Sequence, residues 1–364
     1  MVKLAEPLTV RSLEIPNRVW LPPMCQYQAV DGTPNDWHLV HYGARAVGGF
    51  GLIIAEATGV VPEGRISPAC TGLWSDEHVA AWRKVVDFAH TQGAKMAIQL
   101  NHAGRKASSV PALPDQPHYP TNTVPVNEGG WETVAPSPIA ADGHNTPREL
   151  STAEVRQIPK QFARAAGRAV EAGFDAVEIH GAHGYLLHQF LSPLSNERND
   201  AYGGSFEART RLLLEVVEAV RAAIGEDMPL ILRLSATDWV DAGWSLDDTV
   251  RVSALAQERG ADLIDVTSGG NVSADIPVGP NYQARFADEV RARASVPTAA
   301  VGLITEPAQA EALLVEGRCD AVLIGREALR NPSWPRDAFR ALGMAGGKLG
   351  YPPSYHRAAP RDPR

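Results

Sequence analysis

The sequence of 364 residues predicts an α/β protein, a single (β/α)8 TIM barrel. Eight short apolar runs alternate with helical patterns along the chain. Continuous apolar strands between helices are typical of a parallel sheet that is buried on both faces. Eight such units favour closure of the sheet into a barrel. An open, doubly wound sheet is the main alternative.

The strands and helices of these units follow from apolar spacing and from capping residues. The predicted strands are residues 19–22, 52–58, 96–100, 176–179, 230–234, 263–267, 298–301 and 321–324. The predicted helices are residues 36–45, 75–92, 151–172, 206–224, 245–259, 285–293, 306–316 and 327–341. Ser151 with Glu154 forms a capping box, and Ser245 begins a similar one. Gly173 and Gly260 follow helix ends, where a left-handed residue is needed.

Three segments depart from the repeating pattern. Residues 10–18 predict a hairpin before the first strand, in a position to plug the floor of the barrel. Residues 101–150, after the third strand, form a long connection rich in Pro, Asn, Asp and Gly, which indicates a lid or a small functional excursion. Residues 343–364 read as a tail, either disordered or pinned to a neighbouring subunit, so residues 1–342 form the one predicted domain.

Composition excludes several classes of partner. The net charge of −8 argues against a nucleic-acid-binding protein, because such modules carry a basic face. No apolar run reaches the roughly 18 residues of a membrane span, and no secretory signal is visible. Three widely spaced cysteines without a C-x-x-C pair indicate a reduced, cytoplasmic compartment. The expected partner is therefore a small-molecule substrate.

The end of the fourth strand carries the most informative residues. His180, His183 and Tyr185 follow the apolar run directly, and barrel enzymes place their chemistry at the carboxyl ends of strands. Two imidazoles that can donate hydrogen bonds to one oxygen, with a phenol beside them as a proton source, indicate reduction or enolisation next to a carbonyl. The alternative is a metal site that uses both histidines and Glu178, which lies two residues before His180.

Other strand ends indicate an anionic ligand. Gly302 and Gly325 follow the seventh and eighth strands, where barrels often bind a phosphate, and Arg326 can add bidentate contacts. Their alternative role is to form tight turns. Arg233 lies within an apolar strand, where it either pairs internally, for example with Glu178, or faces an anion such as a reduced flavin.

Residues near the first and third strands leave alternatives open. Gln99 either bonds a flavin carbonyl or ring N–H, or is a satisfied polar residue of the barrel interior. Cys25 is either a nucleophile with His180 as its base or a small buried side chain. Tyr27 is either a hydrophobic wall or a hydrogen-bond donor to the ligand. No G-x-G-x-x-G motif joins a strand to a helix, so no Rossmann domain is predicted.

Together these motifs resemble the Old Yellow Enzyme family of FMN-dependent ene-reductases. The similarity is greatest to the bacterial branch of xenobiotic reductases and thermophilic-like NADPH dehydrogenases, and it covers nearly the whole chain. The residues that carry it are Pro22 to Tyr27, Gln99 to Lys106, His180 to Tyr185, Leu191 to Asn196 and Asp200 to Ser205. Larger relatives with an iron–sulfur cysteine cluster and extra domains are not matched.

The resemblance implies FMN as the bound cofactor and assigns the residues that hold it. Those expected against the ring system are Pro22, Pro23, Met24, Cys25, Ala57 and Gln99, with the Cys25 thiol tuning the flavin potential. Arg233 would stabilise the reduced flavin. Gly302, Gly325 and Arg326 would hold the phosphate, and Lys106 would shape the approach of flavin or nicotinamide.

The resemblance also implies the reaction. NADPH or NADH would give hydride to the flavin, and flavin N5 would pass it to an activated C=C bond of an α,β-unsaturated carbonyl or nitro compound. His180 and His183, assisted by Tyr27, would bind the substrate oxygen, and Tyr185 would supply the proton. Arg357 would enter a neighbour's site in a homo-oligomer, a dimer or a tetramer.

Two rival hypotheses stay open on the sequence alone. One is a metal-dependent hydrolase or lyase, and the other is a low-turnover flavin redox sensor that oxidises at Cys25. Val301 stands where some xenobiotic reductases carry a Trp, which predicts a roomier substrate pocket.

Overall fold

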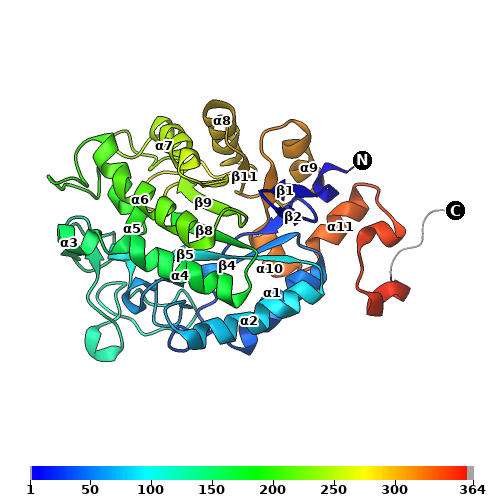
Figure 1. Cartoon of the computed structure of the whole chain (residues 1–364), viewed down its shortest axis with the longest axis horizontal. Coiled ribbons are helices and arrows are strands. Elements are labelled where there is room, and N and C mark those ends of the chain that lie inside the picture. Colours follow the sequence, from blue (N-terminus) through cyan, green and yellow to red (C-terminus); the bar gives the residue numbers. More distant parts are fainter. Residues whose placement is uncertain (1, 359–364) are drawn as a thin grey trace.

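A computed structural model describes residues 2–358, in which eight parallel strands close into a barrel (Figure 1). Around the barrel the strands run in chain order, and β12 pairs with β3 to close it. Their bounds are β3 Val19–Leu21, β4 Leu52–Gly59, β5 Lys95–Asn101, β8 Ala176–Gly181, β9 Leu230–Ser235, β10 Leu263–Thr267, β11 Thr298–Ala300 and β12 Ala321–Leu323. The predicted fold class is confirmed.

Helices cover the outside of the barrel. Their bounds are α1 Asp36–Gly48, α2 Asp76–Thr91, α3 Thr152–Val155, α4 Ile158–Ala172, α5 Leu186–Leu191, α6 Phe206–Ile224, α7 Leu246–Glu258, α8 Ala284–Ala294, α9 Pro307–Val315, α10 Arg326–Arg330 and α11 Trp334–Ala341. Both capping boxes form, with Glu154 and Asp248 as the reciprocal partners of Ser151 and Ser245. None of the helices in the described part of the chain is long and apolar enough to cross a membrane.

Two predicted helices are interrupted by proline. The helix expected over residues 151–172 breaks after α3, because Pro159 has no N–H to donate to the carbonyl four residues earlier and α4 must start anew. The helix expected over residues 327–341 breaks in the same way before Pro332, where Asn331 is extended. The short helix α5 was not predicted, because all six of its residues are buried and it shows no apolar periodicity.

An N-terminal hairpin closes the floor of the barrel. Strands β1 Leu8–Val10 and β2 Leu13–Ile15 pair antiparallel, two residues before the predicted start. Val10 and Ile15 are buried in one apolar cluster with interior residues of the barrel strands, including Trp20. The hairpin therefore plugs the barrel as predicted.

The long connection after β5 covers the opposite end of the molecule (Figure 1). It contains the short parallel pair β6 Val134–Ala135 and β7 Arg148–Glu149 and the 3-10 turns η3 Gly104–Lys106 and η4 Val126–Glu128. The buried side chain of Arg105 donates to the backbone oxygens of Ile139, Ala140 and Asn271. These bonds tie the connection to the segment after β10, so it is folded onto the barrel mouth.

The C-terminal segment lies at the same end as the hairpin (Figure 1). It forms the 3-10 turns η5 Gly346–Leu349 and η6 Pro353–Ala358, and the further turns η1 Lys3–Ala5 and η2 Pro62–Gly64 lie earlier in the chain. Leu349 is buried, and Arg336 donates to the carbonyl of Gly350. Residues up to 350 are therefore attached to their own barrel.

Candidate active site

The end of β8 brings His180, His183 and Tyr185 together. The rings of His180 and His183 lie 5.1 Å apart, nearly perpendicular, and the Tyr185 ring lies 4.9 Å from that of His180. His183 and Gly184 both have left-handed backbones, with φ of 58° and 71°, so the chain turns sharply from the strand into α5. Ser235 at the end of β9 accepts the backbone N–H of His183 and fixes this turn.

Hydrogen bonds assign the same tautomer to both imidazoles. The Ala182 N–H donates to Nδ1 of His180 at 3.3 Å, which leaves the ring proton on Nε2. His180 Nε2 lies 3.4 Å from Nδ1 of His183, and His183 Nε2 lies 3.0 Å from the Thr267 hydroxyl oxygen. Thr267 donates its own proton to Oε1 of Gln283 at 3.1 Å, so its oxygen accepts from His183. Each bond in this chain has one donor and one acceptor.

The contact between the two rings is the weakest link of that chain. At 3.4 Å it is longer than an ordinary hydrogen bond to nitrogen or oxygen. A ligand oxygen can therefore replace His183 as the acceptor of the His180 N–H, whereas the His183 N–H is engaged by Thr267.

Burial sets the charge of these groups. It lowers the pKa of both imidazoles well below the usual value, and the nearby Arg233 charge lowers it further. Burial likewise raises the pKa of Tyr185 well above the usual value for a phenol. At neutral pH the site therefore presents neutral imidazoles and a protonated phenol.

Lys106 braces the same rim. Its ammonium donates to the backbone oxygens of His183, at 2.9 Å, and Gly270, at 3.0 Å, and lies 5.1 Å from the centre of the Tyr185 ring. Burial lowers its pKa to about 8. The residue thus joins the loops after β8 and β10.

A wall of small and aromatic side chains adjoins Tyr185. Cys25, Tyr27 and Tyr185 pack against a buried apolar cluster that contains Ala57 and Cys70. Burial raises the pKa of Tyr27, so this phenol also keeps its proton. Cys25 makes no hydrogen bond to His180 in residues 2–358, and its neighbours are Cys70 and Glu56, which gives no support to the alternative of a nucleophile with His180 as base.

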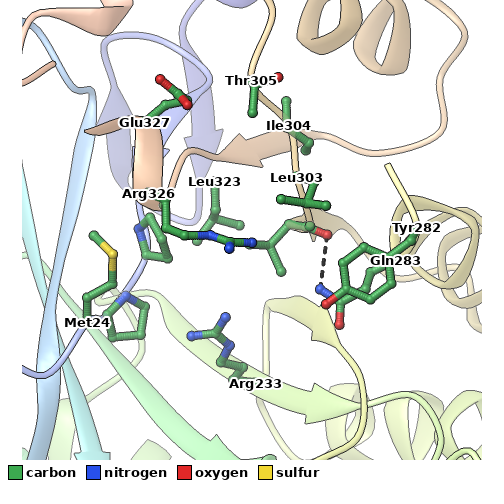
Figure 2. A pocket seen from close by; sticks show the side chains of 15 residues that line it. Met24, Arg233, Tyr282, Gln283, Leu303, Ile304, Thr305, Leu323, Arg326 and Glu327 are labelled. Atoms are coloured by element: carbon green, nitrogen blue, oxygen red, sulfur yellow. Dashed lines mark hydrogen bonds between the residues drawn. The ribbon is translucent and has the colours of Figure 1, made fainter. Parts of the chain in front are cut away.

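Most of the residues expected to hold the cofactor line one cavity of about 230 Å³ (Figure 2). The predicted residues in its wall are Pro22, Pro23, Met24, Arg233, Gly302, Gly325 and Arg326, together with Val301. Figure 2 shows the guanidinium groups of Arg233 and Arg326 pointing into the space between Met24 and Gln283. Cys25, Ala57 and Gln99 are outside this wall, the first two in the neighbouring apolar cluster.

The strand interior below the cavity holds a buried polar network. Arg233 forms an internal pair, one of the two alternatives left open by the sequence, but with Asp265 at 3.0 Å and not with Glu178. Glu178 accepts a bond of 2.6 Å from Gln99, and its pKa is raised well above the usual value by burial and by the Asp265 charge. Because β10 pairs with β9, Asp265 lies opposite Arg233 in register and is its nearest carboxylate.

The residues of the rival metal site do not form one. Within residues 2–358, the one set of three ligand atoms close enough for a metal is Cys25, Glu56 and Cys70. His180 and His183 bond to each other, and Glu178 is bonded to Gln99. The hypothesis of a hydrolase or lyase with His180, His183 and Glu178 as ligands therefore finds no support in the geometry.

The cavity suits the flavin phosphate. Arg326 forms no ion pair with any carboxylate of residues 2–358, so its charge is available to a ligand. Gly302 has φ of 125°, and a Cβ there would lie 3.0 Å from Nε2 of Gln283, so a side chain would crowd the wall. A Cβ on Gly325 would project toward Pro22 and Met24, at 3.7 and 4.0 Å. A guanidinium group without a carboxylate partner and close-lying backbone are groups that bind a phosphate.

Arg357 does not reach the site of its own chain. It lies exposed in η6, at the end of the molecule that carries the N-terminal hairpin (Figure 1). It is not among the residues that line the described cavities.

Several residues that organise the site were not predicted from the sequence. Thr267 and Gln283 fix the tautomer of His183, and Asp265 pairs with Arg233. Thr267 is the last residue of β10, so its place at a strand end is a signal that could have found it. Gln283 comes from a loop, and nothing in its local sequence marks it.

Comparison with known proteins agrees with this arrangement. The model of the NADH:flavin oxidoreductase / NADH oxidase family matches residues 3–342. The NADPH dehydrogenase of Geobacillus sp. (strain WCH70) is 46% identical over 343 residues, which cover 93% of this chain and 94% of that protein. The NADPH dehydrogenase of Bacillus subtilis (strain 168) is 44% identical over 343 residues, covering 93% and 95%.

Solved structures show the same fold. Morphinone reductase in complex with tetrahydroNAD superposes with a TM-score of 0.77 at 29% identity, covering 96% of each chain. The Old Yellow Enzyme homologue from Zymomonas mobilis gives 0.77 at 28% identity, covering 98% of this chain and 99% of that one. 2-Naphthoyl-CoA reductase gives 0.83 at 23% identity, and this chain spans only 52% of its length, so that likeness concerns the fold alone. The chain therefore belongs to the NADH:flavin oxidoreductase / NADH oxidase family, the Old Yellow Enzyme family that its motifs had indicated.

Proposed function

We propose that this flavin-dependent oxidoreductase reduces the activated C=C bond of α,β-unsaturated carbonyl or nitro compounds. NADPH or NADH is the hydride donor, and FMN is the bound cofactor. The observation that carries the proposal is the cluster of His180, His183 and Tyr185 beside a cavity with two guanidinium groups. Neutral donors and a protonated phenol at one rim are what an electron-poor carbonyl substrate requires.

The chain offers two surfaces to FMN. Gly302, Gly325 and Arg326 would hold the phosphate, and Pro22, Pro23, Met24, Cys25, Ala57, Gln99 and Arg233 would surround the rings. When bound, FMN supplies two-electron redox chemistry, accepting hydride from the nicotinamide and passing it to the electron-poor carbon of the substrate.

The imidazoles orient and polarise the substrate. His180 donates its Nε2–H to the carbonyl or nitro oxygen, a role for which its present bond to His183 is weak enough to be replaced. His183, held by Thr267, lines the same position, and Tyr27 assists from the wall that adjoins Tyr185. The Nε2–H of His180 stabilises the negative charge that develops on this oxygen, and the neutral His183 ring sets the position of His180.

Tyr185 supplies the proton to the α-carbon. Its ring lies against His180, and burial holds the proton on the phenol until carbanion character develops beside it. Lys106, above the ring, favours the phenolate that remains after transfer and is then reprotonated from solvent.

The test separates the two half-reactions. The purified protein should show the visible spectrum of a bound flavin, and NADPH should bleach it. In the variant His180→Ala, reoxidation by cyclohexenone should slow by about 10²-fold, the usual effect of losing a donor to a developing oxyanion. Tyr185→Phe should slow the reduction of cyclohexenone while reduction of the flavin by NADPH stays unchanged. Unaltered cyclohexenone turnover in His180→Ala would contradict the assigned role.

The assembly is also part of the proposal. Arg357 would line the substrate site of a neighbouring subunit in a homo-oligomer, a dimer or a tetramer, since it lies exposed in η6 and does not line the cavity of its own chain. Val301 in the cavity wall would leave room for bulky substrates. A cytoplasmic location stays a prediction from the cysteine pattern.

A further inference from the structure

A second cluster of chemically active side chains lies behind the flavin site. Cys25 follows β3, Glu56 lies in β4, and Cys70 lies in the segment between β4 and α2. The two sulfur atoms and a carboxylate oxygen all lie within 4.8 Å of one another. Glu56 and Cys70 are completely buried, and Cys25 is partly exposed. No disulfide joins the cysteines.

The carboxylate of Glu56 is held in a fixed orientation. One oxygen accepts the backbone N–H of Gln26 at 3.1 Å, and the other lies 3.5 Å from the Tyr42 hydroxyl and 3.3 Å from Nε2 of His38. Among the described residues, no lysine or arginine pairs with it. No permanent cation within residues 2–358 therefore contacts this carboxyl group.

The Cys70 thiol is fixed as well. Its sulfur lies 3.2 Å from the hydroxyl of Ser67, and its backbone N–H bonds to the carbonyl of the same residue. Glu56 and Cys70 therefore have set positions, and the three groups come from separate segments.

These groups repel one another if they are all ionised without a cation. The adjacent Cys70 thiol, burial and the Glu56 carboxylate together raise the pKa of the Cys25 thiol. A bound cation would reverse this effect, because a metal ion deprotonates a coordinating thiol outright.

The spacing suits a tetrahedral metal ion. Zinc binds thiolate sulfur at about 2.3 Å and carboxylate oxygen at about 2.0–2.2 Å, which places neighbouring ligand atoms roughly 3.5–3.8 Å apart. Because the ligand atoms all lie within 4.8 Å of one another, each pair needs to close in by at most roughly 1.0–1.3 Å. Two thiolates select thiophilic ions over magnesium or calcium.

We propose that Cys25, Glu56 and Cys70 form a binding site for a thiophilic divalent cation, Zn²⁺ or Cd²⁺. The ion keeps an open fourth position for water. Binding forms two metal–sulfur bonds and one metal–oxygen bond, and the two thiols release two protons to solvent. Cys25 belongs both to this site and to the flavin face of the proposed function, so a bound ion would also change the surroundings of the flavin ring.

Cadmium is the probe, because its bonds to thiolates absorb in the ultraviolet. The reduced, flavin-bound protein is titrated with Cd²⁺, and the metal retained after gel filtration is measured. We expect one tightly bound Cd²⁺ per chain, a cadmium–thiolate band and the release of about two protons. Cys25→Ser and Cys70→Ala should each weaken binding by more than about 100-fold, and Glu56→Gln by about 10-fold or more.

Cys319→Ala is the matched control, since Cys319 is the third cysteine and is buried elsewhere. It should bind Cd²⁺ like the unaltered protein. The proposal is overturned if the unaltered protein shows no cadmium–thiolate band, if the band survives both Cys25→Ser and Cys70→Ala, or if Cys319→Ala abolishes it. The visible flavin spectrum of each variant reports whether the barrel has folded. If the variants at the buried positions Glu56 and Cys70 do not fold, Cd²⁺ binding can still be measured in Cys25→Ser, because Cys25 is less buried.

Discussion

Replacement of Thr267 by valine tests whether the hydrogen-bond chain behind His183 sets up the active site. The substitution keeps the shape of the side chain and removes its hydroxyl. His183 Nε2 then loses its 3.0 Å partner, and Oε1 of Gln283 loses one of two hydroxyl donors while keeping that of Ser268 at 2.6 Å. The main consequence falls on His183, whose ring is free to rotate or to change tautomer.

The size of the effect follows from the bonds that are lost. Leaving a buried donor without a partner costs about 1–3 kcal/mol. Because His183 is only partly buried, water can replace part of the lost hydrogen bond. We therefore take a free-energy cost of about 1.4 kcal/mol, near the lower end of that range. If that free energy separates productive from unproductive orientations of the imidazole, substrate reduction slows by about 10-fold.

Stopped-flow kinetics measure the rate of substrate reduction separately from the rate of flavin reduction. Reoxidation of the Thr267→Val protein by cyclohexenone should slow by about 10-fold, and reduction by NADPH should change little. Thr298→Val is the control, because Thr298 is a buried threonine of the next strand, β11, whose hydroxyl has no hydrogen-bond partner among the described residues. Equal rates for Thr267→Val and the unaltered protein, or an equal loss in Thr298→Val, would refute the reasoning.

Three further predictions concern stability and assembly. Burial opposes ionisation of Asp238, but His188 and neighbouring hydrogen bonds outweigh it and lower its pKa to about 2, against an ordinary 3.8. Asp238→Asn should therefore lower the free energy of unfolding by about 2 kcal/mol at neutral pH. Because the pKa is lower in the folded state, the contribution of Asp238 is complete above about pH 4 and is lost toward about pH 2. In urea unfolding, the difference in free energy of unfolding between the unaltered protein and Asp238→Asn should therefore shrink toward pH 2. A difference that stays constant with pH would contradict this assignment. Gly184→Ala places a Cβ 2.3 Å from the Gly270 carbonyl oxygen at φ of 71°, and should cost more than about 1 kcal/mol, whereas Gly279→Ala, with no atom within 4 Å, should change stability by less than about 0.5 kcal/mol in thermal unfolding. Arg357→Ala should raise the KM for cyclohexenone without loss of flavin, and sedimentation of the unaltered protein as a monomer would speak against a shared site.

Local sequence patterns were sufficient for the framework. Apolar runs located all eight strands, since a strand buried on both faces needs an uninterrupted apolar stretch. Helix α6 matched the predicted range of 206–224, because its cap and its periodicity agree. The same patterns did not predict α5, because every residue of α5 is buried and no apolar periodicity marks it. They also predicted continuous helices across Pro159 and Pro332, where the missing N–H interrupts the helix although the apolar spacing continues.

In the candidate site, too, the sequence predicted the residues that are adjacent along the chain but not the contacts between strands. His180, His183 and Tyr185 could be named from the sequence because they are adjacent in it and follow one strand. The partner of Arg233 could not, because Asp265 and Glu178 lie on the two strands that flank it, and only the side-chain geometry selected Asp265.

The sequence by itself determined the barrel, the strand ends that carry chemistry and the family. These properties depend on periodicity and on residues that are neighbours along the chain. Only the tertiary structure decided which tautomer His183 adopts, which carboxylate neutralises Arg233 and that Cys25, Glu56 and Cys70 meet. Each of these depends on atoms that closure of the barrel brings within a few ångströms from distant parts of the chain, and no local pattern records such a distance.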